Sequence, residues 1–568
     1  MDSQQFREAA TATIDEIITY FDTLGSRGVV SAVEPGYLRK LLPAEAPQDG
    51  EPWADIQKDI EAKIMPGITH WSHPGFHAFF PCATSYPSIL GELYSAALSG
   101  ACFNWICSPA VTELETVVLD WLAKLLGLPA CFLSTGPTRG GGVIQGSASE
   151  AILTAMVAAR DKYLRETLPF PYPLPSSTSS PATDSSDTDT ETANAREEAI
   201  ARKRARMVAL GTTLTHSSAR KAAQILGVRF RAVRVSARDG YALTAPALAA
   251  ALAECRAQGL EPFFLAATLG TTDVCSVDDF AGVAEALDAD YEAAAAAGVV
   301  FSGGGDGFGG RHGDGDGAGD GQRTTTNNGC AAVAGAQGQS RPGEVWVHVD
   351  AAYAGAALVC PEVQARVRIG LIERFHSFDM NMHKWLLVNF DASCFFVRDR
   401  DWLVRALGVN QAVYGNKASD GGLVTDYREW QIPLGRRFRS LKIWFVLRSY
   451  GVKGLQEYIR RTIALGEQFA ASLRAREDLF EIVAGPSFAL TVFRLAARSE
   501  GETLEERNAL TRALYEKVNA TGKIWLTSTV LDGRFAIRLM TGVRTTEREH
   551  VEAAVKTLVE VAEEVMKG

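Results

Sequence analysis

The chain has 568 residues, 46% of them apolar, and a formal net charge of −10. A chain of this length is longer than a single hydrophobic core normally supports, so two or more domains are expected. The net negative charge argues against a nucleic-acid partner. Nine cysteines without a Cys-x-x-Cys pair, a polar start without signal-peptide character and no apolar run that could span a bilayer predict a cytoplasmic protein rather than a secreted disulfide framework.

Residues 1–85 open with an amphipathic helix pattern from Phe6 to Phe21, close to a period of 3.6. The segment from Trp71 to Pro81 is dense in aromatic residues, and its prolines and glycine prevent a continuous helix. His73 and His77 have the i, i+4 spacing of a metal pair, but such a pair needs an unbroken helix. A packed loop without a metal is therefore expected here.

Helices are predicted from Tyr86 to Ala101 and from Ala110 to Leu126. Glycines at 140–142 then lead through Gly146-Ser147-Ala148-Ser149 into a helix pattern from Ile152 to Arg165. Backbone N–H groups at such a helix start can hold a phosphate. An ordinary N-capped helix explains the segment equally well, because it matches neither the dinucleotide-binding fingerprint nor the nucleophile elbow.

Two segments lack the composition of a packed core. Residues from Pro169 to Ala195 are rich in Pro, Ser, Thr and Asp, and residues from Ser302 to Gly343 are rich in Gly and Asp. The second has no sustained nine-residue period and no EF-hand spacing, which disfavours a calcium site. Both are predicted to be disordered inserts near 169–195 and 302–343.

Strands and helices alternate between and after these inserts. Strands are predicted at 205–210, 229–235, 263–272, 346–349 and 377–380, with helices from 215 and over 245–257. This alternation indicates an α/β domain with a mainly parallel sheet and helices on both faces.

The C-terminal part has a different pattern. Helices at 455–473, 505–519 and 547–566 are separated by strands at 480–484, 489–493 and 535–540. We expect an N-terminal helical segment over 1–85, a large domain over 86–441 and a smaller α+β domain over 442–568.

Asp350 and Lys384 suggest a specific chemistry. Asp350 ends the β-rich run Trp346–Val349, and ligands bind at the carboxyl edge of an open α/β sheet. Lys384 precedes an apolar run, a setting that lowers the pKa of an amine. A lysine that forms a Schiff base and an aspartate that pairs with a pyridinium nitrogen are what a pyridoxal phosphate enzyme needs. Taken singly, each residue is more simply read as structural.

Six ordered blocks support this hypothesis: Gly142–Glu150, His216–Ser218, Ala267–Thr272, His348–Tyr353, Asn381–Trp385 and Trp430–Lys442. Together they resemble the aromatic-L-amino-acid decarboxylase family, which comprises group II pyridoxal phosphate decarboxylases of fold type I with a mainly parallel seven-stranded sheet. The resemblance covers nearly the whole chain apart from the two inserts.

The resemblance implies a role for each matching residue. Lys384 would carry pyridoxal 5'-phosphate, and Asp350 would pair with its ring nitrogen. His216 would stack on one face of the ring and Ala352 would pack on the other. The phosphate would be held by Ala148, Ser149 and Asn381, and Thr268 and His383 would line the pocket.

Tyr414 resembles the family's catalytic-loop tyrosine, a suitable general acid for protonating Cα after CO2 leaves. Its loop, Gln411 to Gly422, would close over the substrate. Members that make aldehydes with O2 carry phenylalanine there, so Tyr414 favours simple decarboxylation to an amine. An oxidative aldehyde synthase and a catalytically silent paralogue remain alternatives. The basic residues within 436–442 could also indicate a nucleic-acid-binding module. Structural salt bridges explain these residues better, because the chain is acidic.

The implied substrate is an aromatic amino acid: tryptophan, 5-hydroxytryptophan or dopa, giving tryptamine-type or catecholamine-type products. An aromatic wall suits such a side chain. Gly435 falls where members that take indoles have a small residue, whereas serine there marks histidine or phenolic preference. The matching pocket positions are Trp71, Phe79, Phe80, Pro81, Cys82 and, from the other subunit of an implied homodimer, Ala101 and Phe103.

Four features depart from the family pattern. Met382 replaces the usual Pro or Ala before His-Lys, and Cys82 stands where Thr is common. Ala101 is smaller than the usual Ile, which we expect to enlarge the pocket, and the Tyr414 loop is one residue short.

Overall fold

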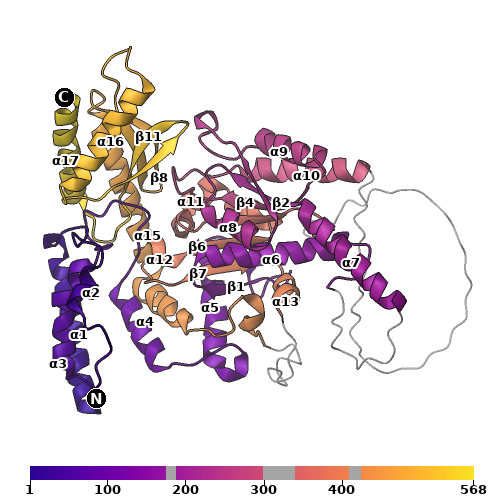
Figure 1. Ribbon diagram of the computed structural model, residues 1–568, viewed down its shortest axis with the longest axis horizontal. Coiled ribbons are helices and arrows are strands. Elements are labelled where there is room, and N and C mark those ends of the chain that lie inside the picture. Colours follow the sequence, from indigo (N-terminus) through magenta and orange to yellow (C-terminus); the bar gives the residue numbers. More distant parts are fainter. Residues whose placement is uncertain (174–186, 298–339, 409–423, 568) are drawn as a thin grey trace, which may run out of the picture.

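A seven-stranded sheet forms the centre of the molecule (Figure 1). The computed structural model describes residues 1–173, 187–297, 340–408 and 424–567. The strand order is β1-β7-β6-β5-β4-β2-β3, and only β7 runs antiparallel to its neighbours. The predicted α/β class with a mainly parallel sheet is thus confirmed. The strands are β1 (Gly141–Gln145), β2 (Met207–Thr212), β3 (Arg229–Val233), β4 (Glu261–Thr268), β5 (Trp346–Asp350), β6 (Ser377–Asn381) and β7 (Ser393–Val397).

Helices cover both faces of this sheet because successive strand side chains point to opposite faces. In β5, Trp346 packs in one apolar cluster, with α6 (Ala148–Thr167) and α8 (Ser217–Ile225), whereas Val347 and Val349 pack in another. His348 and Asp350 therefore face α6. The second cluster contains α5 (Pro109–Leu125), α9 (Ala245–Ala257), α10 (Phe280–Ala296) and part of α15 (Arg439–Arg474).

A four-stranded antiparallel sheet forms the C-terminal part, shown in yellow in Figure 1. It has a core of its own against α16 (Leu504–Ala520), α17 (Arg548–Lys567) and the end of α15. The domain boundary predicted at 441/442 falls inside α15, whose helical geometry is interrupted at Gly451 (φ 62°, ψ 177°). The strands are β8 (Phe480–Ser487), β9 (Leu490–Leu495), β10 (Thr527–Leu531) and β11 (Arg534–Met540), in the order β10-β11-β9-β8.

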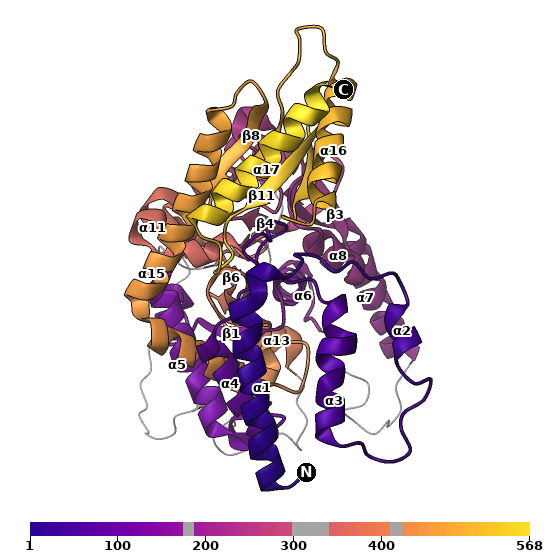
Figure 2. The ribbon, with the colours of Figure 1, turned by 90° about the vertical axis from the view of Figure 1, so that its left-hand side faces the viewer.

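The N-terminal helices project from the rest of the chain. Figure 2 shows α1 (Ser3–Thr23) and α3 (Trp53–Asp59) pointing the same way, away from the four-stranded sheet, with α4 (Tyr86–Ala97) behind α1. The Asp2 carboxylate caps α1 by accepting from the N–H groups of Gln4 and Gln5. No residue of α1 is buried.

Backbone hydrogen bonds tie the aromatic segment near residue 77 to both sheets. His77 donates to Trp525 O (2.9 Å) and accepts from Met540 N (3.0 Å), and Ala83 N donates to His383 O (2.8 Å). Across the same junction, the Arg538 side chain of β11 donates to the carbonyl of Thr272 (2.6 Å). The chain between His77 and Ala83 is thereby held beside the short helix that carries Lys384.

The structure corrects one sequence prediction. Disorder was expected through Ala195, but α7 spans Asp187–Arg206. A run of helix formers begins inside the predicted insert, and its Lys203 pairs with Glu261 at 2.6 Å. The strand expected from 205 accordingly starts at Met207. Residues 174–186 and 302–339 of the predicted inserts lie outside the described residues, whereas 169–173 and 340–343 are described.

Two strands of the large sheet, β1 and β7, and the helix α10 had no counterpart in the sequence prediction. None of the helices in the described ranges is long and apolar enough to cross a membrane.

Candidate active site

The carboxyl ends of β4, β5 and β6 bring polar side chains together. The strands are in register, so Thr268 lies opposite Asp350 and Asp350 lies opposite Asp379. Asn381 ends β6 on the same face, two residues after Asp379. All four side chains are buried. This edge of the sheet, beneath the start of α6, is where an open α/β fold binds ligands.

Lys384 lies directly after this edge, on α12 (Met382–Trp385). Its Nζ is 5.6 Å from the centre of the Phe80 ring. Phe80 stacks on Tyr353 with ring centres 3.9 Å apart, and Tyr353 stacks on Trp385 at 4.7 Å. The apolar surroundings remove water from the amine, so the pKa of Lys384 is lowered, although Asp350 and Asp379 partly oppose the effect. A lowered pKa increases the fraction of free amine available as a nucleophile.

Asp350 is held in place from its own strand end. Its Oδ1 accepts the N–H of Ala352 at 3.1 Å, and Ala352 O accepts the N–H of Asn381 at 3.0 Å. Both Asp350 and Ala352 are buried. A carboxylate fixed at this position can keep a heterocyclic nitrogen protonated.

Two helix starts face the same edge. His216 follows β2 and caps α8, where its Nδ1 accepts the N–H of Ser218 (3.3 Å), which places the hydrogen of the neutral ring on Nε2. Ser147 caps α6 by accepting the N–H of Glu150 (3.2 Å). The N–H groups of Ala148 and Ser149 have no acceptor within their helix, so they are free for an anion.

His383 and Met382 flank Lys384 in the chain. His383 accepts the N–H of Ala392 on Nδ1 (2.8 Å), and burial and the neighbouring Lys384 lower its pKa to about 3, so the ring is neutral at physiological pH. Met382 is fully buried, and its N–H donates to Ala392 O at 3.0 Å. A proline at 382 would lack this hydrogen bond, so Met382 holds the start of α12 more firmly.

Orphaned oxygens at this edge of the sheet point to a binding site, among them those of Thr268 and Asn381. Thr268 Oγ1 and Asn381 Oδ1 are buried without a hydrogen-bond partner in the described part of the chain. Buried polar atoms are nearly always paired in native proteins. A polar ligand above the sheet would satisfy both. The residues therefore fit pyridoxal phosphate, with Lys384 for its carbonyl, Asp350 for its ring nitrogen and the α6 start for its phosphate.

The remaining substrate positions form two further groups. Trp71 stacks on Phe79 at 5.5 Å, and Phe79 is half-exposed. Separately, Arg436 N donates to Ala101 O at 2.7 Å, which fixes Gly435 beside Ala101 in the same chain. Arg428 N holds the carbonyl of Phe103 at 3.1 Å. Pro81 and Cys82 continue from Phe80 toward Lys384, and the Cys82 thiol acts electrostatically on its amine. Tyr414 and its loop lie outside the described residues.

The basic run after Gly435 forms salt bridges within the fold. Buried Arg436 pairs with buried Glu115 of α5, whose Oε1 also accepts the N–H of Ile144 (2.8 Å). Arg439 pairs with Asp391 at 2.9 Å. Lys442 pairs with Glu92 at 2.5 Å. These contacts favour the structural interpretation over a nucleic-acid surface.

The histidines of the aromatic segment make local contacts. His73 Nδ1 accepts the N–H of Gly75 (2.9 Å), and His77 Nδ1 lies 2.8 Å from Met540 O. Within the described ranges, no group of three or more His, Cys, Asp or Glu side chains is placed to hold a metal ion.

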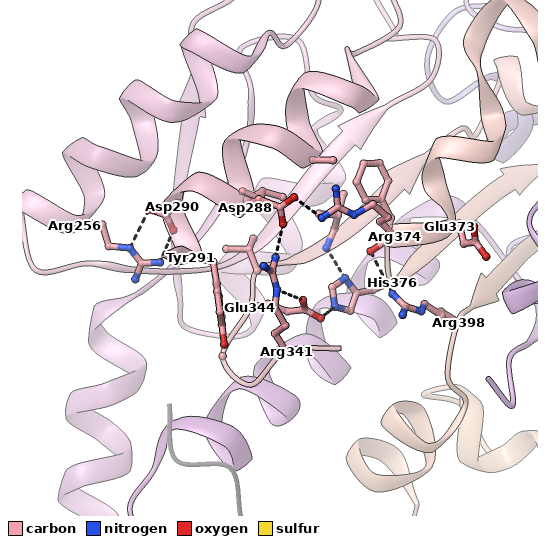
Figure 3. Close-up of a pocket in the computed structure, with 16 residues that line it drawn as sticks. Arg256, Asp288, Asp290, Tyr291, Arg341, Glu344, Glu373, Arg374, His376 and Arg398 are labelled. Carbon is pink, nitrogen blue, oxygen red and sulfur yellow. Dashed lines mark hydrogen bonds and ion pairs between the residues drawn. The ribbon is translucent and has the colours of Figure 1, made fainter. Parts of the chain in front are cut away.

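A cavity of about 720 Å³ opens at the opposite edge of the sheet, at the amino ends of β5 and β6 (Figure 3). Several of its charged groups are paired with one another, such as Arg256 with Asp290 (2.7 Å) and Arg341 with Asp288 (2.6 Å). No lysine lines it. It therefore lacks the groups required for the chemistry predicted at Lys384.

Sequence reasoning missed two buried residues at the site, His348 and Asp379. His348 Nε2 lies 3.1 Å from Asp379 Oδ1, and neither side chain is exposed. The signal was present in the alternation of polar residues at 377, 379 and 381, immediately before Lys384. On a strand, these positions share the face that carries Asp350.

Comparisons with known proteins identify the family of the chain. The sequence matches the family model described as the pyridoxal-dependent decarboxylase conserved domain over residues 35–168, 188–304 and 323–496. It is 39% identical to an aromatic-L-amino-acid decarboxylase of Mus musculus, covering 100% of this chain and 99% of the relative. It is equally similar (39%) to a phenylacetaldehyde synthase of Arabidopsis thaliana, covering 99% and 96%.

A solved structure shows the same fold. The crystal structure of Oryza sativa TDC with PLP and tryptamine matches with a TM-score of 0.81 and 33% identity, covering 100% of this chain and 99% of that one.

The orphaned oxygen of Thr268 predicts an unusual response to Thr268→Val. Removing a buried, unpaired hydroxyl should leave the cofactor-free protein as stable as wild type or up to about 1 kcal/mol more stable, while the affinity for pyridoxal phosphate falls about tenfold. Thermal unfolding and fluorescence titration measure the two effects.

Thr462→Val is the matched control, because Thr462 Oγ1 accepts from Trp385 Nε1 (3.2 Å) and donates within its helix. It should lower the stability by about 1–3 kcal/mol. A Thr268→Val protein that is less stable but binds the cofactor normally would contradict the assignment of Thr268 to the binding site.

Proposed function

The chain belongs to the pyridoxal-dependent decarboxylase family, and from this premise we propose that it converts an aromatic L-amino acid to the corresponding arylalkylamine and CO2. The cofactor of the family, pyridoxal 5'-phosphate, supplies a sink for the electron pair freed at Cα. The observation that carries the proposal is the desolvated amine of Lys384, placed beside Asp350 under a stack of aromatic rings.

Each residue of the site has a separate role in this reaction. Lys384 would hold the cofactor through its amine and would release it to the amine of the substrate. Asp350 would keep a proton on the ring nitrogen, and His216 would pack against the ring with its Nε2–H available as a donor. The Phe80 stack excludes water from the reacting amine. Tyr414 delivers the proton to Cα after CO2 has left.

The substrate is an aromatic amino acid with a large ring: tryptophan, 5-hydroxytryptophan or dopa. Phe80 supplies an apolar, stacked wall next to Lys384. At Gly435, which is exposed, an added Cβ would meet no described atom of the chain within 4 Å, so the position tolerates a side chain. The small side chain of Ala101 lies beside it. These features support an indole more than a phenol.

Two copies of the chain form the complete site. Three large apolar residues of α1 are exposed, Phe6 (61%), Ile14 (47%) and Ile18 (42%), and no residue of this helix is buried. An exposed apolar face of this kind marks an association surface, and a twofold dimer covers the same face on both copies. Because Arg436 N fixes Gly435 to Ala101, both residues come from the same subunit, the partner of the one that supplies Lys384.

The protein works in the cytoplasm. All eight cysteines in the described part of the chain are free thiols. Free thiols persist in a reducing compartment.

An aldehyde synthase is the second candidate, since a phenylacetaldehyde synthase is as similar to this chain as the amine-forming relative. The products decide between the two. With L-tryptophan, we expect equal amounts of CO2 and tryptamine and no hydrogen peroxide, whereas Tyr414→Phe should divert the product to aldehyde with O2 uptake and peroxide release. Chromatography and a peroxide assay measure these products.

Peroxide in proportion to CO2 from the wild-type enzyme would make it an aldehyde synthase. No turnover of any aromatic amino acid by cofactor-loaded protein would make it a silent paralogue.

Gly435→Ser should change the preference for the ring. The serine fits without displacing any described atom but occupies the space beside Ala101, so the ratio of kcat/KM for tryptophan to that for tyrosine should fall about tenfold or more. Steady-state kinetics with both substrates measure the ratio.

Gly370→Ser is the matched control, because a Cβ at that position also meets nothing within 4 Å and it lies away from the site. Its ratio should equal that of the wild type. A wild-type enzyme that prefers tyrosine to tryptophan would overturn the indole assignment.

Charges placed on α1 should separate the subunits. In the double variant Ile14→Asp, Ile18→Asp, each carboxylate would have to be buried at the interface, so sedimentation should give a species of 61.2 kDa instead of twice that mass, with loss of activity. Glu8→Gln, also on α1, should sediment as the wild type. A wild-type protein that sediments as a fully active monomer would refute the shared site.

A further inference from the structure

Asp350 has a second carboxyl group beside it. Asp379 lies opposite Asp350 across adjacent parallel strands, on the face toward α6, and its side chain is fully buried. Neighbouring strands are about 4.8 Å apart, so two ionised carboxyls here repel each other strongly. Two adjacent buried carboxyls therefore require either a positive charge nearby or protonation of one of them.

A chain of hydrogen bonds orients Asp379. Trp346 Nε1 donates to Ser377 Oγ (2.8 Å), Ser377 Oγ lies 2.9 Å from His348 Nδ1, and His348 Nε2 lies 3.1 Å from Asp379 Oδ1. The indole N–H can only donate, so Ser377 Oγ accepts from it and keeps its own hydrogen available for His348 Nδ1. An ionised Asp379 can only accept, so the chain ends with His348 Nε2 donating to Asp379 Oδ1.

The other oxygen of Asp379 is available to the site. Oδ2 is buried and has no hydrogen-bond partner among the described residues. The ionisable groups that act on Asp379 are His348 and Asp350 of β5, Lys384 of α12 and Cys394 of β7. Lys384 contributes the amine of the site to that set. Burial and Asp350 raise the pKa of Asp379 to about 6, so it is mostly ionised at neutral pH.

We propose that Asp379 is a positioning residue: His348 holds it as a second carboxylate beside Asp350, and the two together balance the positive charges at Lys384 and at the ring nitrogen of the bound cofactor. With one carboxylate, the protein would supply a single counter-ion for two buried positive charges, which is costly. The inference concerns cofactor binding by the family and does not depend on the choice of substrate, so it is tested without substrate.

The raised pKa has a cost for the cofactor-free fold. Between pH 3.8, the ordinary pKa of the group, and about pH 6, the native state keeps a proton that the unfolded chain has lost. The free energy of unfolding therefore decreases as the pH rises through this window and is constant above it. Asparagine at 379 cannot ionise, so it removes both the cost and the counter-charge.

Asp379→Asn in the full-length protein tests the proposal with two measurements. Without cofactor, its Tm should exceed that of wild type by a margin that opens between about pH 4 and pH 6 and stays constant above. With cofactor, the Kd for pyridoxal phosphate at pH 7.5 should rise about tenfold, the effect of losing about 1.4 kcal/mol. A cofactor-free variant that is less stable than wild type at pH 7.5, or one with an unchanged Kd, would overturn the proposal.

Asp278→Asn is the matched control. Asp278 is equally buried and its pKa is also raised to about 6, but its two oxygens accept the N–H groups of Leu243 and Thr268, each at 2.7 Å. Its amide replacement leaves one of those donors unpaired, so the cofactor-free Tm should fall. If Asp278→Asn instead raised the Tm to the same extent as Asp379→Asn, the gain would come from removing any buried acid, and the special role of Asp379 would be refuted.

Discussion

The amine of Lys384 lies where water is excluded and where the carboxylates of Asp350 and Asp379 supply the largest opposing charge effects among the described residues. Desolvation disfavours the protonated amine, whereas Asp350 and Asp379 favour it. The balance leaves an amine that exchanges partners easily, which is what a residue that both holds and yields a cofactor requires. The rest of the molecule can be understood as the means of keeping that balance.

The parallel sheet provides the first part of this arrangement. Its register sets Thr268, Asp350 and Asp379 side by side, and its neighbouring helix starts add N–H donors at the same edge. The second part comes from the contact between the two sheets. The segment from His77 to Ala83 is hydrogen-bonded to the small sheet at one end and to His383 at the other, and so Phe80 covers the amine. Buried ion pairs such as Glu115–Arg436 fix the surrounding loops.

Much of this could be predicted from the sequence because it depends on local patterns. The strand-end position of Asp350 and the apolar run after Lys384 predicted the proposed site, and the alternation of strands and helices predicted the sheet. The contacts that set the electrostatics could not be predicted, since the His348–Asp379 bond depends on the register between two strands. The start of α7 could not be predicted from the composition of residues 169–195. The Ser/Thr-rich part of this stretch outweighs the helix formers that follow it. Gly435 and Ala101 were both identified, but only the structure places them together.

The central claim is that the chemistry takes place on the amine of Lys384, and chemical trapping tests it most directly. Borohydride reduction of the protein loaded with pyridoxal phosphate, followed by peptide mass spectrometry, should place one reduced pyridoxal phosphate group on Lys384. Lys384→Ala should lose both this label and the long-wavelength absorbance of the loaded protein. A label on a different lysine of the wild type, or an unchanged absorbance band in Lys384→Ala, would contradict the account.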